Sequence, residues 1–328
     1  MPTNKKGNEP QSGSFGFMAA DTRPSLWRNG EVMMVRDPDG GLSRNKGVHL
    51  EKHTLPVHDA RRPAGTDRLT CETNGFELQT APLGGSIDFL DHAQVVRRYY
   101  PHCAELVAAI TGARAYAFDH NVRSATGERE KRRITGGQNV QGPAHVVHGD
   151  YTLRSAVDRV QQLALPPEGN DTLRGYLPEG RSLISPEQAS RALTEGGRLA
   201  IINVWRNIDD HPVTTHPMAL CDSQTVRPDD LVVFEIHYPN RIGENYWAKY
   251  SEDLRMHYYP EMAGEEALII KQWDSAGPLA RSQGAHGDAS EPDAPCTFSF
   301  HSAFHPTKAP DDPRDRWSIE VRCLVIYP

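Results

Sequence analysis

The sequence contains no apolar stretch close to the roughly 20 residues that a helix needs to cross a bilayer. The segment MPTNKKGNEPQSGS at its start lacks the apolar core of a secretory signal. Cysteine is scarce, with five scattered residues and no CxxC pair. These absences predict a cytoplasmic protein that has reduced thiols and no membrane partner.

An excess of positive charge is also absent, since 36 Lys and Arg residues stand against 43 Asp and Glu residues and give a net charge of -7. No nucleic-acid partner is therefore expected, because phosphate contacts need a basic surface. No glycine-rich GxGxG turn that would bind S-adenosylmethionine is found. The 38% of hydrophobic and 24% of charged residues over 328 positions are typical of a globular chain with a sizeable core.

Local patterns divide the chain into a tail and one domain. Residues 1–14 are polar and contain Gly, Pro and Ser, which predicts a flexible N-terminal tail before a single domain over residues 15–328. The segment DHAQVVRRYYPHCAELVAAITG repeats apolar residues at helical spacing and predicts a helical insertion at about 92–112. A second, irregular helical insertion is expected at about 153–197, with a short helix capped by Ser185.

The second half of the sequence is rich in strand signals. Loops of Asp, Pro and Gly separate five runs of β-branched and aromatic residues, GRLAIINVWRNI, DDLVVFEIHY, EALIIKQWDS, CTFSFHSAF and WSIEVRCLVIYP. This density of strands indicates a β-sandwich or barrel. Several runs are apolar throughout, so some strands are expected to be buried on both faces or covered by helices. The sequence therefore predicts a mainly β fold with flanking helices.

The tripeptide His-Gly-Asp occurs twice, with its histidine at His148 and at His286. A His and an Asp two residues apart can bind one metal ion when a rigid element fixes their geometry. His148 follows the apolar residues AHVV and is expected at the end of a strand, whereas His286 lies in a loop rich in Ser, Gly, Asp and Pro. We therefore expect a metal at His148 and Asp150, and a solvated loop at the second copy.

A third ligand is expected from the late strand CTFSFHSAFHP, which carries His301 and His305. Two histidines and one carboxylate on adjacent strands form the facial triad that holds non-haem Fe(II) and leaves positions open for oxygen and a cosubstrate. Positions 301 and 305 face the same side of a strand, so periodicity does not choose between them.

Arginines near the later strands are candidates for binding a dicarboxylate cosubstrate. Arg316 and Ser318 begin the last strand-like run, and a guanidinium pairs a carboxylate through two parallel hydrogen bonds. Arg322, further along the same run, and Arg206, after IINVW, are the reserve candidates. Two alternatives stay open: Arg316 could form a surface ion pair with a neighbouring aspartate, and Arg206 could be a buried structural arginine paired with Asp222.

Motifs spread over residues 56–327 resemble the fungal and bacterial hydroxylase/desaturase family that is named for a cephamycin methoxylase component and includes gibberellin-desaturase-like and AsaB-like proteins. They include YYPHCAELVAAITGA, FDHNVR, GPAHVVHGDYT, IINVWR, FHSAF and RWSIEVR. Members of this family look like double-stranded β-helix enzymes, with a jelly-roll or cupin-like barrel, that use Fe(II), 2-oxoglutarate and O2.

The resemblance implies a site in this chain. The family's metal and catalytic residues match His148, Asp150 and His301, and the match favours His301 over His305 although His305 has the commoner spacing to the arginine. Arg316 and Ser318 match the start of the family's last strand, which implies that they bind the far carboxylate of 2-oxoglutarate.

The function that the resemblance implies is hydroxylation, desaturation or ring closure at an unactivated C–H bond of a small secondary-metabolite substrate. Two alternatives from other classes remain: a non-catalytic accessory subunit with the same barrel, and an S-adenosylmethionine-dependent methyltransferase, which the missing glycine-rich turn disfavours. The sequence leaves a homo-oligomeric state open.

Overall fold

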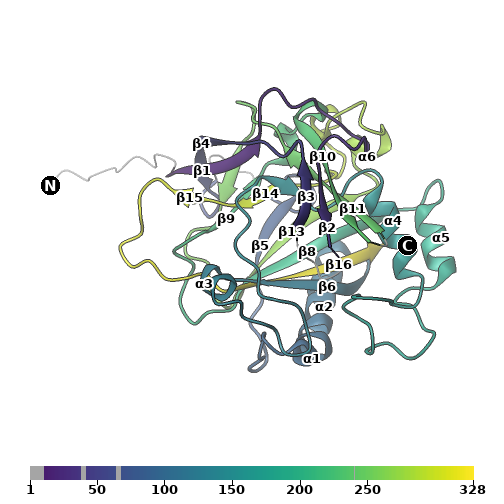
Figure 1. The fold of residues 1–328 in the computed structure, drawn as a ribbon. Helices are drawn as coiled ribbons and strands as arrows, with labels where there is room; N and C mark the ends of the chain where they lie inside the picture. Colours follow the sequence, from purple (N-terminus) through teal and green to yellow (C-terminus); the bar gives the residue numbers. More distant parts are fainter. Residues whose placement is uncertain (1–10, 38–41, 64–67, 240) are drawn as a thin grey trace.

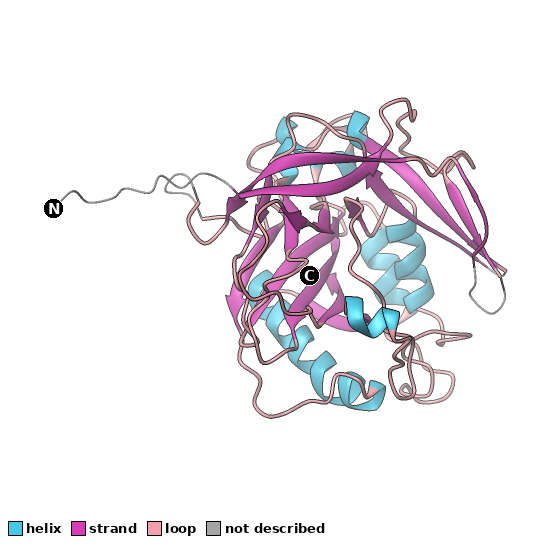
Figure 2. Ribbon diagram, turned by 60° about the vertical axis from the view of Figure 1, so that its left-hand side comes forward, coloured by secondary structure: helices cyan, strands magenta, loops and turns pink. Residues whose placement is uncertain are grey.

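Two β-sheets dominate the computed structural model, which describes residues 11–37, 42–63, 68–239 and 241–328 (Figure 1). The larger sheet contains, in spatial order, β15 (His305–Pro306), β1 (Gln11–Met18), β4 (Leu50–Asp59), β12 (Met256–Tyr258), β9 (Met218–Cys221), β14 (His301–Ala303), β7 (His148–Gly149), β11 (Arg241–Ala248), β10 (Leu231–Tyr238), β2 (Met33–Arg36) and β3 (Leu42–Lys46). The smaller sheet contains β5 (Phe76–Thr80), β13 (Glu266–Asp274), β8 (Leu199–Asn207), β16 (Ser318–Ile326) and β6 (Arg114–Arg123). The predicted mainly β fold with flanking helices is confirmed (Figure 2).

A helical segment covers the outer face of the smaller sheet, where α2 contacts β6, β16 and β8. The segment consists of α1 (His92–Gln94), the π-helical turn η1 (Val95–Tyr99) and α2 (Tyr100–Thr111). Pro101, in the first turn of α2, has no N–H to donate to the carbonyl of Arg97, and the wider π turn before it accommodates the missing bond. The chain thus stays helical across the proline, over the residues where apolar spacing predicted an insertion.

The side chains of β8 alternate between this helical layer and the space between the two sheets. Every residue of β8 is buried. Arg206 donates to the hydroxyl of Tyr99, which lies in the helical segment, at 3.0 Å. Asn203 lies on the opposite face and donates to Asp150, just after β7 of the larger sheet, at 2.9 Å. Odd-numbered positions of β8 therefore face the interior between the sheets, as the period of two along a strand requires.

Short helices lie mostly in the connections between strands. They are α3 (Ala125–Arg129), α4 (Ser155–Leu163), α5 (Pro186–Leu193), α6 (Pro278–Arg281) and the 3-10 turns η2 (Ser223–Thr225), η3 (Pro228–Asp230) and η4 (Asp288–Ser290). Helices α4 and α5 fall within the second expected insertion and pack against each other. The Ser185 hydroxyl caps α5 by accepting from the N–H of Gln188 at 3.2 Å. The side-chain oxygen of Gln188 in turn accepts from the N–H of Ser185 at 2.8 Å.

A Ser185→Ala variant should lose about 1 kcal/mol of unfolding free energy, because two backbone donors at the start of α5 are satisfied by this reciprocal cap. Ser190, exposed in the middle of the same helix, gives the control: Ser190→Ala should change stability by no more than about 0.5 kcal/mol. Urea denaturation of the two variants checks the difference, and equal midpoints would contradict it.

One boundary differs from the prediction. Gln11–Ser14, assigned above to a flexible tail, belong to β1, where Ser14 pairs with Thr54 of β4 and with His305 of β15. The polar composition of this stretch is compatible with a strand because its backbone is bonded on both sides. The prediction for residues 1–10 lies outside the described residues.

Two observations bear on the expected environment of the protein. Within the described ranges, no helix has both the length and the apolar character needed to cross a membrane. All five cysteines, Cys71, Cys103, Cys221, Cys296 and Cys323, are buried and free. Burial raises the pKa of the Cys103 thiol to about 12, so these side chains serve as small apolar groups in the core.

Candidate metal centre

Three side chains predicted to bind metal meet between the two sheets. The short strand β7 lies between β11 and β14, and this pairing sets His148 directly opposite His301. The two imidazole centroids are 4.4 Å apart, and His148 Nε2 is 3.7 Å from Asp150 Oδ1. One ligand atom from each of the three residues lies within 4.8 Å of the other two. This spacing is suited to a single metal ion.

Hydrogen bonds orient two of the three ligands. His148 Nδ1 lies 2.8 Å from the carbonyl oxygen of Val146, which can only accept, so Nδ1 carries the proton and Nε2 is left for a metal. Asp150 Oδ2 accepts from Asn203 Nδ2 at 2.9 Å and from Arg322 Nε at 3.0 Å. Asp150 Oδ1 is the oxygen that faces His148. Each residue therefore presents one defined atom.

Gln272 of β13 supports the other two ligands and was missed by sequence reasoning. Its side-chain oxygen accepts from the N–H of Asp150 at 3.0 Å, and its amide nitrogen lies 3.3 Å from His301 Nδ1. The residue is completely buried. Its neighbours Lys271 and Asp274 form a separate ion pair at 3.1 Å near the end of the strand. Only the packing of the two sheets against each other shows that Gln272, and not these charged neighbours, reaches the site.

A Gln272→Ala variant should bind iron about 10–100-fold more weakly, because groups that orient metal ligands typically contribute this much to affinity. Fe(II) binding to the metal-free protein, followed by competition with a chelator, measures the change. An unchanged affinity in a variant with the wild-type melting temperature would show that Gln272 only fills space.

The protonation states of the three residues suit metal binding. Burial, followed by the proximity of His301, lowers the pKa of His148 to about 4, and burial likewise lowers the pKa of His301 to about 4. Burial alone would raise the pKa of Asp150, but the Arg322 charge and the two imidazoles hold it below its usual range. At neutral pH the centre therefore offers two neutral imidazoles and one carboxylate, which are the forms that bind metal.

A second polar feature lies at the start of β16, where Arg316 precedes the strand and Ser318 is its first residue. Arg316 is 2% exposed, and its Nη1 donates to the carbonyl oxygen of His216. Its Nε and Nη2 and the Ser318 hydroxyl are buried and have no hydrogen-bond partner among the described residues. The guanidinium carbon lies 5.6 Å from the ring centroid of Trp205. Burial and the charge of Arg123 lower the pKa of Arg316 to about 9, and the carboxylates of Glu320 and Asp315 only partly offset this effect.

Comparison with known proteins places the chain in a family. Residues 23–326 match the family described as "Oxidoreductase/YMDC permease-like domain". The hydroxylase/desaturase CTB9 of Cercospora beticola is 30% identical over 308 residues, which are 88% of this chain and 79% of the relative. The chain belongs to this oxidoreductase family of hydroxylase/desaturases.

Other relatives agree with this assignment. The Fe(II)/2-oxoglutarate-dependent dioxygenase nvfI of Aspergillus novofumigatus is 28% identical over 91% of this chain and 96% of the relative. A solved structure described as the iron and alpha-ketoglutarate-dependent endoperoxidase NvfI superposes with a TM-score of 0.70 at 23% identity, covering 98% of this chain and 99% of that one, and so shares the jelly-roll fold. An uncharacterized Methylophilus leisingeri protein, encoded in the dcmA 3' region, is 42% identical over 195 residues, 59% of this chain and 88% of that protein.

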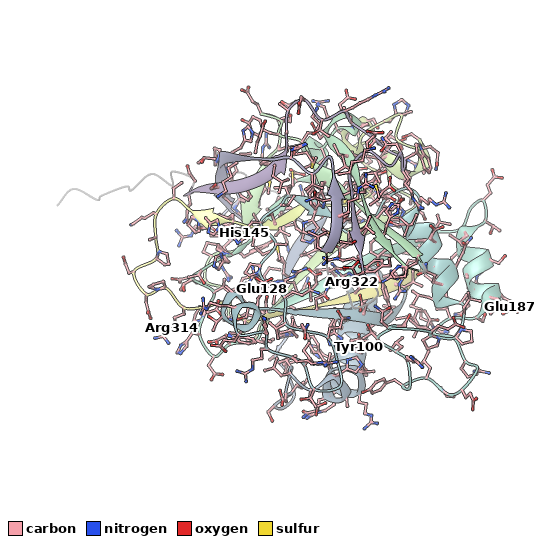
Figure 3. The ribbon with its side chains drawn as sticks, viewed as in Figure 1. Tyr100, Glu128, His145, Glu187, Arg314 and Arg322 are labelled. Atoms are coloured by element: carbon pink, nitrogen blue, oxygen red, sulfur yellow. The ribbon has the colours of Figure 1, made fainter. Side chains whose placement is uncertain are left out.

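The other two candidate arginines, Arg322 and Arg206, lie elsewhere in the structure. Arg322, a reserve candidate for the cosubstrate, is inside the molecule (Figure 3), where it bonds Asp150 and pairs with Asp119 at 3.2 Å. Its position supports the carboxylate ligand. Arg206 faces the helical layer and is bonded to Tyr99 and to the carbonyls of Ala81 and Gly264. Arg206 is thus a buried structural residue, and its partners do not include Asp222.

The structure also bears on the ion-pair alternative for Arg316 and on the solvated loop expected at His286. Among the described residues Arg316 is in no ion pair, and Asp315 instead accepts from the hydroxyl of Ser124 at 2.5 Å. His286 is exposed in its loop, as predicted. Asp288 is buried, contrary to the expected solvated loop, and accepts from the N–H and hydroxyl of Thr297, both at 2.7 Å. The second His-Gly-Asp thus anchors a loop through its aspartate.

Two cavities, of about 440 and 390 Å³, are lined by none of the candidate metal ligands or candidate arginines, although Trp317 in the second is the residue after Arg316. The first is lined by α2, β6 and residues 173–177, and the second by residues 87–90, Arg132, Ile208, Asp209 and Trp317. Neither cavity is lined by a candidate metal-binding residue, so neither one marks the position of the candidate metal centre.

Proposed function

We propose that this protein is an Fe(II)/2-oxoglutarate-dependent dioxygenase that hydroxylates or desaturates an unactivated C–H bond of a small secondary-metabolite substrate. The observation that carries the proposal is the pairing of a two-histidine, one-carboxylate cluster with a buried arginine, Arg316, whose Nε and Nη2 have no acceptor among the described residues. The names of the relatives support the same reaction class.

The donor set fits Fe(II). Two neutral imidazoles and one carboxylate are the ligands of non-haem iron sites that keep three positions open. His148, Asp150 and His301 would hold the ion. Bound there, iron would supply O2-dependent oxidation of a C–H bond, coupled to conversion of 2-oxoglutarate to succinate and carbon dioxide.

The surroundings of Arg316 fit the far carboxylate of 2-oxoglutarate. A buried guanidinium with two unsatisfied nitrogens is costly, and a carboxylate that accepts from both of them would remove this cost. Ser318, two residues along the same strand face, would donate its hydroxyl to the same group. Trp205, opposite in the interior, would shield the pair from water and strengthen it.

The protein's part in the chemistry is to orient the metal ligands and to keep the Asp150 carboxylate ionised. Asn203 and Arg322 bind one oxygen of Asp150 and so direct the other oxygen toward the histidines. Arg322 also keeps this carboxylate ionised, because it holds the pKa of Asp150 down. A retained carboxylate ligand occupies a coordination position that halide would need, so hydroxylation or desaturation is favoured over halogenation.

The environment and partners are part of the same proposal. A small-molecule substrate follows from the enclosed position of the cluster between two sheets, and the acidic net charge of -7 gives no support to a nucleic-acid partner. Five free, buried thiols support a cytoplasmic location.

Succinate release tests the proposed reaction. Protein supplied with Fe(II), 2-oxoglutarate and air should form succinate slowly without substrate and faster with a suitable metabolite, with one succinate for each 2-oxoglutarate consumed. An accessory subunit would release none under any of these conditions, and that outcome would overturn the proposal.

A further inference from the structure

Three further histidines converge near the end of the barrel that carries Arg316. They are His145, three residues before His148; His216, in the loop before β9; and His305, in β15. One ring nitrogen from each lies within 4.8 Å of the other two. The rings of His145 and His305 stack at a centroid separation of 4.0 Å, and His216 meets them edge-on at 5.0 and 5.1 Å. Figure 3 labels His145 close to β14 and β15.

Two of these histidines have polar atoms that nothing in the described chain satisfies. The Nδ1 atoms of His145 and His216 are buried without a hydrogen-bond partner. Such atoms are rare in native proteins and call for a bound water, ion or ligand. His305 is exposed, so an ion can reach the cluster from solvent.

The backbone at His216 adds an independent observation. Its φ is 47°, in the left-handed region that residues other than glycine seldom adopt. Pro217 follows, and a residue before proline normally prefers an extended conformation. Strained residues of this kind concentrate at functional sites, where surrounding contacts hold them in place. One such contact is the bond from Arg316 to the His216 carbonyl.

We propose that His145, His216 and His305 form a second metal site, which binds a divalent transition ion such as Zn2+ or Co2+ separately from the His148–Asp150–His301 centre. Imidazole is a preferred ligand of these ions, and three imidazoles leave a coordination position open. The ion would tie together three segments distant in sequence, including the loop whose carbonyl holds Arg316. This site does not depend on the proposed function.

The charges around the three histidines set an expectation for the metal affinity of this second site. The three ligand side chains include no carboxylate, and the positive charges of Arg316 and Lys52 act on His145, while the Asp315 carboxylate acts on His216 from nearby. Without a carboxylate ligand, the three-histidine site should bind a cation more weakly than the centre that contains Asp150.

Titration of the metal-free, full-length protein with Co2+, followed by visible absorption, tests the proposal. Wild type should take up two equivalents. A His148→Ala/His301→Ala variant keeps Asp150 as the partner of Arg322 and should take up one. Adding His305→Ala, which removes an exposed side chain, should weaken that remaining site at least about 100-fold, since a direct ligand contributes more than the 10–100-fold typical of outer groups. Adding His216→Ala should have the same effect.

His286→Ala, added to the same double variant, is the control and should leave the remaining equivalent unchanged. If the double variant takes up no Co2+, or if the His305→Ala addition leaves its uptake intact, the second site is wrong. If wild type binds one equivalent that depends on His305 and releases no succinate, the second site stands while the proposed dioxygenase function fails.

Discussion

A His148→Ala variant is expected to lose iron binding and turnover, because one of the three ligand atoms that converge on the site is removed. The loss of affinity should be at least about 100-fold, beyond the effect of removing an orienting group. Metal analysis after desalting, with the rate of succinate formation, measures both losses. Asp150→Ala should behave in the same way, and should also leave Arg322 without one of its partners.

The second His-Gly-Asp provides the matched control for this change. His286→Ala removes the same residue type from the same tripeptide at an exposed position and should keep wild-type iron and activity. Loss of iron in the His286 variant, with retention in the His148 variant, would show that the metal binds at the second copy of the tripeptide and that the present assignment is wrong.

Arg316→Ala should raise the concentration of 2-oxoglutarate needed for half-maximal activity by roughly a hundredfold or more, while iron still binds. Removing one partner of a buried charge pair costs on the order of 2–5 kcal/mol, and about 1.4 kcal/mol corresponds to a factor of ten. Arg316→Lys should recover only part of the loss, since an ammonium group cannot donate two parallel hydrogen bonds to one carboxylate.

Arg314 supplies the control for this prediction. It is exposed two residues earlier, at the edge of the molecule in Figure 3, and pairs with Asp312 at 2.8 Å. Arg314→Ala should leave the 2-oxoglutarate dependence unchanged. A shift in the Arg314 variant as large as that of Arg316→Ala would point to a general change in the barrel and against a specific carboxylate contact.

The strands of the second half were predictable because their signal is local. GRLAIINVWRNI, EALIIKQWDS and WSIEVRCLVIYP correspond to β8, β13 and β16, the three central strands of the smaller sheet. The strand β1 was missed because its residues QSGS carry no strand signal, and it is held by pairing with β4 and β15, which are distant in sequence. Long-range pairing of this kind cannot be read from local composition.

His148 and Asp150 were predictable from their spacing and strand context, and His301 was chosen over His305 only through the family resemblance, whereas the groups that hold these ligands were not predicted. Asn203 and Gln272 are ordinary polar residues within apolar runs, and only the packing of the smaller sheet, which contains β8 and β13, against the larger sheet, which contains β7, brings them to Asp150. Arg206 was a candidate because it follows an apolar run. Because side chains alternate along a strand, Arg206 must lie on the face opposite Asn203. Their spacing of three residues in IINVWR was therefore enough to exclude Arg206 from the site once Asn203 was known to face it.

Anaerobic titration of the metal-free protein with Fe(II) and then 2-oxoglutarate tests the central claim most directly. Chelation of the keto-acid to iron in a three-ligand site gives a weak visible charge-transfer band. We predict that this band appears in wild type, saturates at one 2-oxoglutarate per protein, is absent in His148→Ala, and needs much higher 2-oxoglutarate in Arg316→Ala. A folded wild-type protein that binds Fe(II) yet shows no band at saturating 2-oxoglutarate would contradict the account.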